Sequence, residues 1–238
     1  RNRDQNKSNC GGSCVSCIPR RFLTKLLWRD GIVTFVSERQ RELHVKAKVF
    51  GGTSKVIVQN PISNELPRIE YRSRKYDYGY IGRISPEKGL ANLLKVFESN
   101  HQTLHIAGTG EEKYIEALRK ISPLANFYGF LDKWEFLKEV KVLIVPSIWE
   151  EPAGRIVREG IWAGCSLAIS KYGGLQEMGE IPEVNIFVFD PLSEPSIAKI
   201  FKISKKYDTQ LNSSKLEMNL RKKSNVLLDE IQKLLKNE

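Results

Sequence analysis

The sequence predicts an α/β protein with one complete doubly wound domain on a parallel sheet, preceded by part of a second α/β domain. From residue 78 onward, short β-branched runs alternate with segments whose apolar residues recur at helical spacing. This alternation is typical of a parallel sheet that is covered by helices on both faces. Upstream, the apolar runs 32–36 and 55–58 predict two more strands, and the polar, aperiodic stretch 63–77 is typical of an interdomain linker.

Each expected element follows from a local signal. Ser37 is a good N-cap for a short helix between the first two strands. Ser85 and Pro86 predict a helix start, because serine caps helices and proline suits the first helical position. In the second domain we expect strands at 78–81, 103–107, 126–128, 142–145, 166–169 and 186–189. We expect helices from residue 85 and around 111–120, 133–139, 155–163 and 195–204.

These elements divide the chain into four expected parts. They are a partial N-terminal domain with a cysteine-rich segment at 1–62, the linker at 63–77, a complete C-terminal domain at 78–210 and a C-terminal helix at 211–238. The chain begins Arg-Asn-Arg-Asp without an initiator Met, so we expect it to start partway through a longer protein. The last helix has one apolar stripe, formed by Leu227, Ile231, Leu234 and Leu235.

The composition describes a basic chain with a real apolar core. Apolar residues make up 41% of the sequence, and no apolar run approaches the roughly 20 residues that cross a bilayer. The net charge is +10, and residues 1–50 hold eleven Lys or Arg against four acids. A basic patch favours phosphate-rich partners or an anionic membrane face, and a solvated lysine-rich surface is the plainer alternative. Aromatic residues are not interleaved with the basic ones, so we expect no nucleic-acid partner.

Three cysteines cluster near the start of the chain. Cys10, Cys14 and Cys17 have the C-x3-C-x2-C spacing of a radical-SAM iron–sulfur motif, although Ser16 stands where an aromatic residue is usual. A structural zinc site with one further ligand is a second interpretation, and unligated loop cysteines are the simplest one. The pattern is not the disulfide framework of a secreted domain, so we expect a reduced, cytoplasmic location.

Four features lie at the carboxyl ends of predicted strands, where a doubly wound sheet binds its ligands. The first is Gly82-Arg83, which runs into the helix start at Ser85 and reaches Lys88. Helix N-termini favour anions, and two cations add to this, so the segment suits a diphosphate. Arginine and lysine beside a capped helix are also ordinary surface residues, and that interpretation stays open.

Two glycine turns are the second and the fourth feature. The Gly108-x-Gly110 turn ends a strand, but Lys113 stands where a dinucleotide-binding fingerprint has its third glycine. The Gly173-Gly174 turn precedes another expected helix. Each turn allows the backbone to approach a ligand closely.

The third feature is a pair of carboxylates around a helix start. Glu151 lies in the loop after a strand, and Gly154 begins a helix that carries Glu159 about one and a half turns further on. Both carboxylates can therefore face one cleft and accept hydrogen bonds from two polyols, such as a ribose and a hexose. The alternative is a structural one, in which Glu159 pairs with Arg155 or Arg158 on the surface of the helix.

In order and spacing, these features resemble the C-terminal domain of the large retaining GT-B glycosyltransferase family with the E-x7-E motif (glycosyl transferases group 1, mannosyltransferase-like). The resemblance covers about residues 78–190. The matching motifs are Gly82-Arg83, Pro86-Glu87-Lys88-Gly89, Gly108-x-Gly110, Pro146-Ser147 with Glu151-x7-Glu159, and Gly173-Gly174 with Glu177. The family's fold pairs two Rossmann-like domains, so the resemblance implies one complete domain plus the C-terminal remnant of the other.

The resemblance also implies an activity, the transfer of a sugar from a nucleotide-diphosphate donor to an acceptor with retention and without a metal. No Asp-x-Asp motif supports a metal-dependent transferase, and no cofactor is required beyond the UDP- or GDP-sugar donor. Arg83 and Lys88 would stabilise the leaving diphosphate, Glu151 would bind the sugar hydroxyls and Glu159 the ribose. The remaining donor-binding residues would be Gly82, Gly108, Gly129, Phe130, Gly154, Arg155 and Ile156.

The acceptor side is less well represented in the chain. The resemblance implies a glycan or lipid-linked acceptor, and the basic N-terminal segment suggests peripheral contact with the inner membrane face. The family's glycine-rich acceptor loop and catalytic histidine would lie upstream of this chain. Ala153 and Gly160 replace the usual Phe and Ala, which we expect to enlarge the edge of the pocket slightly.

Two alternatives of other classes stay open. A non-catalytic nucleotide-sugar-binding subunit would keep the donor site without transfer, and the missing acceptor-side residues favour it. A radical-SAM iron–sulfur enzyme would use the three clustered cysteines, but the following sequence lacks a matching barrel pattern.

Overall fold

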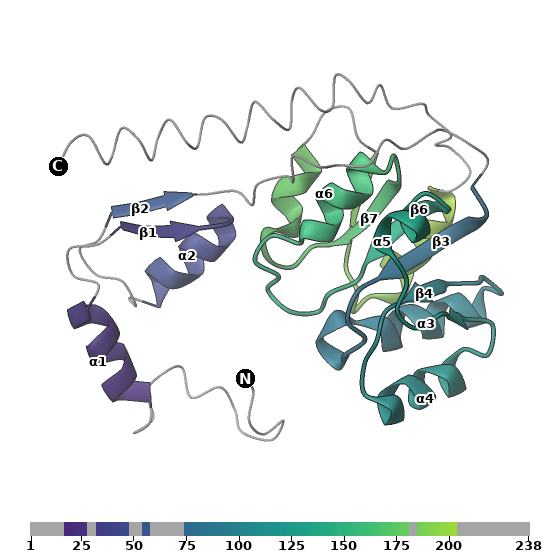
Figure 1. Ribbon diagram of the computed structural model, residues 1–238, viewed down its shortest axis with the longest axis horizontal. Coiled ribbons are helices and arrows are strands. Elements are labelled where there is room, and N and C mark those ends of the chain that lie inside the picture. Colours follow the sequence, from purple (N-terminus) through teal and green to yellow (C-terminus); the bar gives the residue numbers. More distant parts are fainter. Residues whose placement is uncertain (1–16, 28–31, 48–53, 58–73, 181–184, 204–238) are drawn as a thin grey trace. The chain divides into compact units, whose positions relative to one another are not determined.

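The structure, a computed structural model, describes residues 17–27, 32–47, 54–57, 74–180 and 185–203 (Figure 1). The chain divides into two compact units, Arg1–Val58 and Gln59–Glu238. The predicted C-terminal helix at 211–238 and most of the predicted linker lie outside the described residues.

The described residues of the first unit form two helices and a pair of strands. They are α1 (Cys17–Leu27), β1 (Ile32–Phe35), α2 (Glu38–Lys46) and β2 (Ser54–Ile57). The two strands are parallel, with Ile32 opposite Ser54. As predicted, Ser37 caps α2, and its hydroxyl accepts a hydrogen bond from the backbone N–H of Gln40 at 3.2 Å. The unit therefore contains a β-α-β segment, the repeating motif of an α/β domain.

The second unit is built on a six-stranded parallel sheet. Its strands are β3 (Tyr76–Ile81), β4 (His105–Ala107), β5 (Asn126–Phe127), β6 (Val140–Val145), β7 (Ser166–Ser170) and β8 (Ile186–Phe189). Their spatial order is β5-β4-β3-β6-β7-β8, and all neighbours run parallel. This is the strand order of the Rossmann fold, so the predicted doubly wound α/β class is confirmed.

Helices cover both faces of this sheet. One core contains side chains from α3 (Leu90–Ser99), α4 (Glu112–Ile121) and α7 (Glu194–Ala198), and the other contains side chains from α5 (Lys133–Leu137) and α6 (Arg155–Trp162). Residues of β6 alternate between the cores, since Val142 and Ile144 belong to the first and Leu143 and Val145 to the second. Burial on both faces explains why this strand is an unbroken apolar run in the sequence.

The helix predicted from Ser85 begins later, at Leu90, and the prediction of one continuous helix is wrong. Pro86–Lys88 form a single 3-10 turn, η1, and Gly89 follows with a φ of 75°, in the left-handed region. A Cβ at Gly89 would lie 2.0 Å from the carbonyl oxygen of Pro146. The turn is therefore shaped by close packing against the loop after β6, a tertiary contact that local capping signals do not contain.

The remaining differences concern the ends of elements. β3 begins at Tyr76, inside the stretch predicted as linker, and β4 begins at His105 rather than residue 103. The segment after the Gly173-Gly174 turn is a 3-10 helix, η2 (Gly173–Glu180), instead of an α-helix. The helix predicted around 195–204 is the short α7, followed by a third 3-10 segment, η3 (Lys199–Lys202).

Candidate functional site

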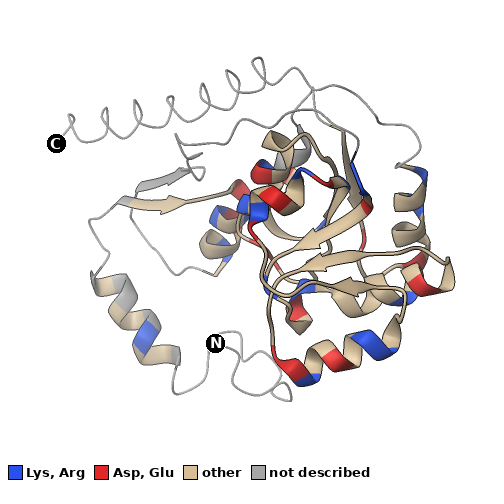
Figure 2. Ribbon diagram, turned by 45° about the vertical axis from the view of Figure 1, so that its right-hand side comes forward, with Lys and Arg blue, Asp and Glu red and all other residues tan. Residues whose placement is uncertain are grey.

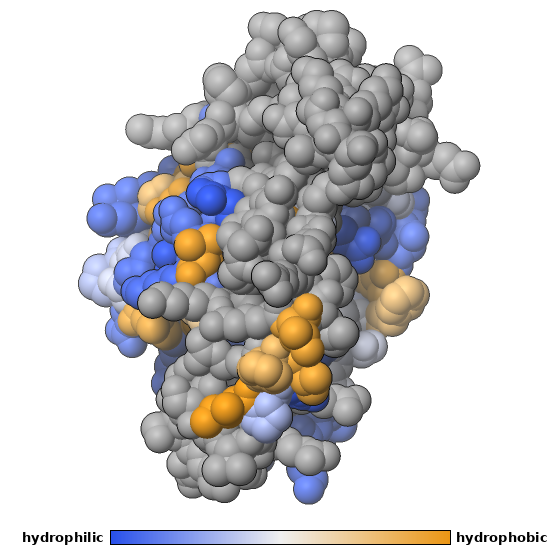
Figure 3. Space-filling view, turned by 90° about the vertical axis from the view of Figure 1, so that its left-hand side faces the viewer, coloured by the Kyte–Doolittle hydropathy of each residue, from blue (hydrophilic) through white to orange (hydrophobic). Residues whose placement is uncertain are grey.

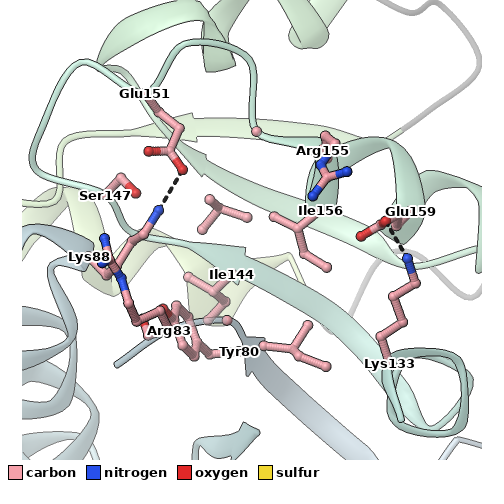
Figure 4. A pocket seen from close by; sticks show the side chains of 14 residues that line it. Tyr80, Arg83, Lys88, Lys133, Ile144, Ser147, Glu151, Arg155, Ile156 and Glu159 are labelled. Carbon is pink, nitrogen blue, oxygen red and sulfur yellow. Dashed lines mark hydrogen bonds and ion pairs between the residues drawn. The ribbon is translucent and has the colours of Figure 1, made fainter. Parts of the chain in front are cut away.

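A cavity of about 430 Å³ opens at the carboxyl ends of β3 and β6, beside the loop that precedes α6 (Figure 4). The strand order reverses between these two strands, and a doubly wound sheet binds ligands at that point. The lining residues are Tyr80, Ile81, Gly82, Arg83, Lys88, Lys133, Ile144, Val145, Ser147, Glu151, Gly154, Arg155, Ile156 and Glu159. They include four cationic and two anionic side chains, so the formal net charge of the lining is +2.

An ion pair between Lys88 and Glu151 lies at one end of this cavity. Lys88 Nζ is 2.6 Å from Glu151 Oε1, and the two side chains are only 19% and 12% exposed. The left-handed Gly89 brings Lys88 against the loop after β6, where the N–H of Ile148 donates to the carbonyl of Glu87 at 3.0 Å. The pair uses one carboxylate oxygen, and Glu151 Oε2 is buried without a hydrogen-bond partner in the part of the chain that the structure describes.

A second ion pair, between Lys133 and Glu159, lies at the other end. Lys133 Nζ is 2.6 Å from Glu159 Oε1, and the side chains are 43% and 22% exposed. Lys133 is the first residue of α5, whose start is fixed by Asp132, because the Asp132 carboxylate accepts from the N–H groups of Trp134 and Glu135. Glu159 projects from α6, so the pair joins two helices of the same face across the cavity (Figure 4).

The segment after β3 supplies a third cation. The Arg83 side chain is 68% exposed and lies 2.8 Å from Glu87 Oε1. Burial opposes the charged form of Glu87, but hydrogen bonds from Ser85 and the backbone, together with nearby cations, outweigh it and lower the pKa of the carboxyl. Tyr80 donates to the carbonyl of Arg83 at 2.6 Å. Burial, helped by the charge of Glu151, raises the pKa of Tyr80, which stays a protonated donor at neutral pH.

Arg155 differs from the other three cations. It is exposed at the start of α6, and among the described residues it has no ion-pair or hydrogen-bond partner. Gly154 at the N-cap supplies no side-chain hydrogen bond to the first turn of the helix. A cation and uncapped N–H groups therefore face the same part of the cavity, an arrangement that favours an anion.

A second cavity, of about 460 Å³, adjoins the first. Ile81, Gly82, Arg83 and Lys133 line both, so the two form one continuous depression. The further lining residues are Gly108, Thr109, Phe130, Leu131 and Asp132. The Phe130 ring is 83% exposed and offers a flat apolar surface on which a base can stack.

The structure brings ten of the eleven predicted site residues to these two cavities. Gly82, Arg83, Lys88, Glu151, Gly154, Arg155, Ile156 and Glu159 line the first, and Gly82, Arg83, Gly108 and Phe130 line the second. Gly129 lines neither, but its carbonyl accepts from the N–H of Gly108 at 2.7 Å and so holds the glycine turn in place.

Three polar residues that line the first cavity were not among the predicted site residues: Tyr80, Lys133 and Ser147. The segment Pro146-Ser147 follows a predicted strand, and Lys133 follows the N-cap Asp132, so both stood beside detectable signals. Glu159 pairs with Lys133, a partner that the structural alternative with Arg155 or Arg158 did not include. The sequence separation of 26 residues between Lys133 and Glu159 hides that contact from local inspection.

The two expected departures from the family pattern lie away from the cavity edge. Gly160 is buried on α6, where a Cβ would lie 2.4 Å from Leu143 Cδ2 and 3.0 Å from Leu167 Cδ2. Ala153 is 6% exposed. The small residue at 160 therefore lets α6 pack closely on the sheet and does not widen the pocket.

The predicted cysteine cluster cannot be placed. Cys10 and Cys14 lie outside the described residues, and Cys17 is the first residue of α1. Within the described ranges, no group of three or more His, Cys, Asp or Glu is arranged to hold a metal ion. Cys165 is a free thiol in the core of the second unit, where burial raises its pKa to about 11.

A parallel sheet in Rossmann order with a cationic cavity at its switch point is the arrangement in which doubly wound α/β proteins typically bind their ligands. The chain belongs to the family described as Glycosyl transferases group 1, whose model matches residues 63–225. The predicted membership of the glycosyl transferases group 1 family and the predicted GT-B fold are thereby confirmed, and the structural relatives agree with the fold.

Among curated proteins, the chain is similar to an uncharacterized 42.6 kDa protein in the cps region of Klebsiella pneumoniae, with 26% identity over 67% of this chain and 43% of that protein. It is also similar to an uncharacterized glycosyltransferase of Methanocaldococcus jannaschii, with 30% identity over 50% of this chain and 33% of the relative. The chain therefore spans less than half the length of these relatives.

Among solved structures, the chain is similar to HepE of Anabaena in complex with UDP and glucose. The TM-score is 0.72 at 18% identity, over 92% of this chain and 66% of that one. A glycosyltransferase of Rickettsia africae matches with a TM-score of 0.69 at 14% identity, over 98% of this chain and 68% of the other. At these identities the likeness concerns the fold.

Proposed function

We propose that the depression between β3 and β6 binds a nucleotide-diphosphate sugar, and that the whole protein transfers this sugar to an acceptor with retention. The observation that carries the proposal is the charge of the first cavity, in which four cations exceed two carboxylates by +2. A diphosphate diester carries two negative charges, so this excess matches the donor. The carboxylates remain available for hydroxyl groups, which a simple phosphate site does not require.

Each residue has a role in this proposal. Arg83, Lys88 and the start of α6 with Arg155 would hold the diphosphate, and Glu159 would accept hydrogen bonds from the ribose. Glu151 would bind the sugar hydroxyls at the end of the cavity that it shares with Lys88. The base would lie in the second cavity against Phe130.

The proposed reaction needs charge stabilisation more than acid or base catalysis. The bond between the anomeric carbon and the diphosphate oxygen breaks, and the diphosphate leaves with the electron pair. The acceptor hydroxyl attacks the same face, and its proton passes to the departing oxygen. Preorganised cations at Arg83 and Lys88 stabilise the charge that develops there, which is the part a metal ion plays in other transferases. We therefore expect transfer to persist in EDTA.

Calorimetric titration of donors tests the site. UDP-glucose and GDP-mannose are suitable probes, UDP first because the HepE structure holds UDP. We expect Arg83→Ala, Lys88→Ala and Glu159→Gln each to weaken binding about tenfold, the loss of one charge-assisted contact. Lys141→Ala is the matched control, since Lys141 pairs with Asp77 at 2.7 Å outside the cavity lining. Unchanged affinity in all three variants contradicts the site.

A transfer assay separates the enzyme from a non-catalytic donor-binding subunit. Transfer of glucose from UDP-glucose to a glycan or lipid-linked acceptor supports the proposed reaction if the product keeps the anomeric configuration of the donor. NMR measures this configuration. Donor binding without transfer by the whole protein supports the binding subunit instead. A product of inverted configuration contradicts retention.

We also propose that α1 contacts an anionic membrane surface, where a lipid-linked acceptor would lie. Four apolar side chains of α1 are each more than half exposed: Ile18, Phe22, Leu23 and Leu26. Figure 3 turns the left-hand side of Figure 1 toward the viewer and shows a group of hydrophobic side chains there. The sequence of the helix, CIPRRFLTKLL, contains three basic residues and no acidic one, and Figure 2 shows a basic residue on this helix. Apolar side chains beside basic ones are typical of helices that lie in a membrane interface.

Vesicle sedimentation tests the membrane proposal. We expect the chain to bind vesicles that contain phosphatidylglycerol, and Phe22→Ser with Leu26→Ser to release it. Equal binding to neutral vesicles, or no effect of the double variant, contradicts the proposal. Within the described residues, no helix combines the length and the apolarity that crossing a bilayer requires.

A further inference from the structure

Two residues that line the first cavity each have a buried polar atom without a hydrogen-bond partner among the described residues. Ser147 is 1% exposed, and its Oγ forms no hydrogen bond with the described residues. The Glu151 side chain is 12% exposed, and its Oε2 is likewise buried without a partner. Figure 4 shows both side chains at the same end of the cavity, with the Lys88 amine beside them.

Unpartnered buried oxygens of this kind are rare in folded proteins. Most buried polar side-chain atoms have a hydrogen-bond partner, and an exception at a cavity wall indicates a bound water, ion or ligand. Of the two unpartnered oxygens, Glu151 Oε2 is the harder to satisfy, because a carboxylate oxygen only accepts hydrogen bonds and so needs a donor. Lys88 occupies Oε1, so Oε2 requires a donor that the described residues do not supply.

The backbone holds Ser147 in fixed relation to the ion pair. Its neighbour Pro146 packs its carbonyl against Gly89, at the position a Cβ would fill. Its other neighbour, Ile148, donates its N–H to the carbonyl of Glu87 at 3.0 Å. The 3-10 turn that carries Lys88 is thus attached to the chain on both sides of Ser147. The hydroxyl is therefore preorganised, and binding does not require a loop to be ordered around it.

We propose that Ser147 is a specificity-determining residue for the donor sugar, and that its hydroxyl and Glu151 Oε2 together form a subsite for sugar hydroxyl groups. The inference rests on the proposed function. A sugar hydroxyl donates to the carboxylate oxygen, and another exchanges a hydrogen bond with Ser147. The subsite selects hexoses that present free hydroxyls there, because a deoxy or O-alkyl sugar leaves a buried oxygen unpaired.

This subsite is separate from the groups that would hold the nucleotide. Arg83 and Arg155 face the diphosphate region, and Glu159 lies at the opposite end with Lys133. A change at Ser147 should therefore affect the sugar and spare the nucleotide. That division gives a readout that a general loss of structure does not reproduce.

The test compares ligands with and without the sugar. UDP and UDP-glucose, and GDP and GDP-mannose, are titrated calorimetrically into the wild-type chain, Ser147→Ala and Ser147→Cys. Alanine is slightly smaller than serine, and cysteine is larger and bonds weakly, so similar losses in both variants separate the lost hydrogen bond from a packing defect. We expect both variants to bind the nucleotide sugar about tenfold more weakly and the free nucleotide within about twofold of wild type.

Ser122→Ala is the matched control. Ser122 is also 1% exposed, but its hydroxyl donates to Glu98 at 2.7 Å beyond the end of α4. We expect this variant to lose stability while it keeps the affinity for both ligands.

The outcomes are distinguishable. Unchanged nucleotide-sugar affinity in both Ser147 variants, as expected if only a water occupies the subsite, overturns the inference and leaves the proposed function standing. An equal loss for nucleotide and nucleotide sugar also overturns it. A wild-type chain that binds none of the four probes overturns the proposed function and the inference together.

Single-deoxy donors then identify the hydroxyl. We expect wild type to bind one deoxy analogue about tenfold more weakly than the parent donor. For this same analogue, the affinity of Ser147→Ala should equal that of wild type, because the hydrogen bond is already lost. Additive losses for every analogue would contradict a direct contact with Ser147.

Discussion

At the scale of single residues, the site contains two lysine–glutamate pairs of different exposure. Lys88 and Glu151 are mostly buried, whereas Lys133 and Glu159 are partly open to solvent. An exposed pair contributes little to folding, about 1 kcal/mol or less. Lys133 lines both cavities, so we infer that it contributes electrostatic attraction of the proposed donor rather than stability.

Lys133→Met tests this interpretation. The change removes one positive charge from the cavity and leaves Glu159 unpaired beside the expected diphosphate, so we expect UDP affinity to fall about three- to tenfold. Calorimetry at low and high salt measures it, because the deficit should shrink as screening increases. Lys138→Met is the matched control, since Lys138 lies at the opposite end of the same helix, outside both cavity linings, and pairs with Glu135. Equal affinities for wild type and Lys133→Met would contradict the interpretation.

The partly buried His105 predicts how the free energy of unfolding depends on pH. Burial lowers its pKa, while the charge of Asp77 acts in the opposite direction. The ring stacks on Tyr76 with centroids 4.1 Å apart, and Nδ1 lies 2.8 Å from the hydroxyl of Tyr128. The folded state thus disfavours the protonated ring relative to the unfolded chain, whose histidine pKa is about 6.5. The contribution of His105 is fully present above that value and is lost as the pH falls toward the folded pKa.

Urea denaturation between pH 7.5 and 5 checks this sign. We expect the wild-type midpoint to fall over this interval and the fall to be smaller in His105→Gln. A variant with the same pH slope as wild type would show that other groups govern the acid side.

At the scale of elements, Arg74 ties together the two helices that present the second ion pair. Its guanidinium donates to the carbonyl of Leu137 at 3.0 Å, near the end of α5, and to the carbonyls of Val140 and Ala163. Ala163 is the C-cap of α6. A cation suits helix C-termini, where carbonyls lack partners. Arg74 therefore fixes the spacing of the helices that begin with Lys133 and carry Glu159.

Arg74→Met tests this clamp. Three carbonyl oxygens lose a charged donor, so we expect the free energy of unfolding to fall by about 2 kcal/mol. Arg74→Lys should recover only part, since lysine lacks the planar fork that reaches several carbonyls. Thermal and urea denaturation provide the measurement. Lys75→Met, at the exposed neighbouring residue, is the control, and equal stability of the Arg74→Met and Lys75→Met variants would refute the clamp.

The same elements show what the sequence could predict. Burial on both faces makes strands such as β6 nearly continuous apolar runs. Local patterns could therefore predict the parallel sheet and the alternation of strands and helices along the chain. The carboxylates and cations at strand ends were accessible for the same reason. The break at Gly89 and the pairing of Lys133 with Glu159 were not, because both depend on contacts between segments far apart in the chain. Burial of the Ser147 hydroxyl likewise has no sequence signature.

At the scale of the whole molecule, every residue that lines the two cavities belongs to the second unit. The lining residues run from Tyr80 to Glu159, and the second unit is Gln59–Glu238. The basic segment and α1 belong to the first unit. Donor binding and the proposed membrane contact are thus assigned to different parts of the chain.

A fragment of residues 59–238 tests this division. We expect it to bind UDP-glucose within about threefold of the full chain, since no described donor contact is removed. The fragment should no longer sediment with anionic vesicles. Circular dichroism confirms folding first, and a folded fragment without donor affinity would show that the first unit contributes to the site.

The central claim is that a nucleotide diphosphate lies between β3 and β6. A crystal structure of the chain with UDP-glucose tests it most directly. We expect the diphosphate oxygens to lie within hydrogen-bond distance of Arg83 and Lys88. The ribose hydroxyls should contact Glu159, and the glucose should contact Glu151 and Ser147. An ordered UDP-glucose at any other surface of the chain, with this cavity occupied by solvent, would contradict it.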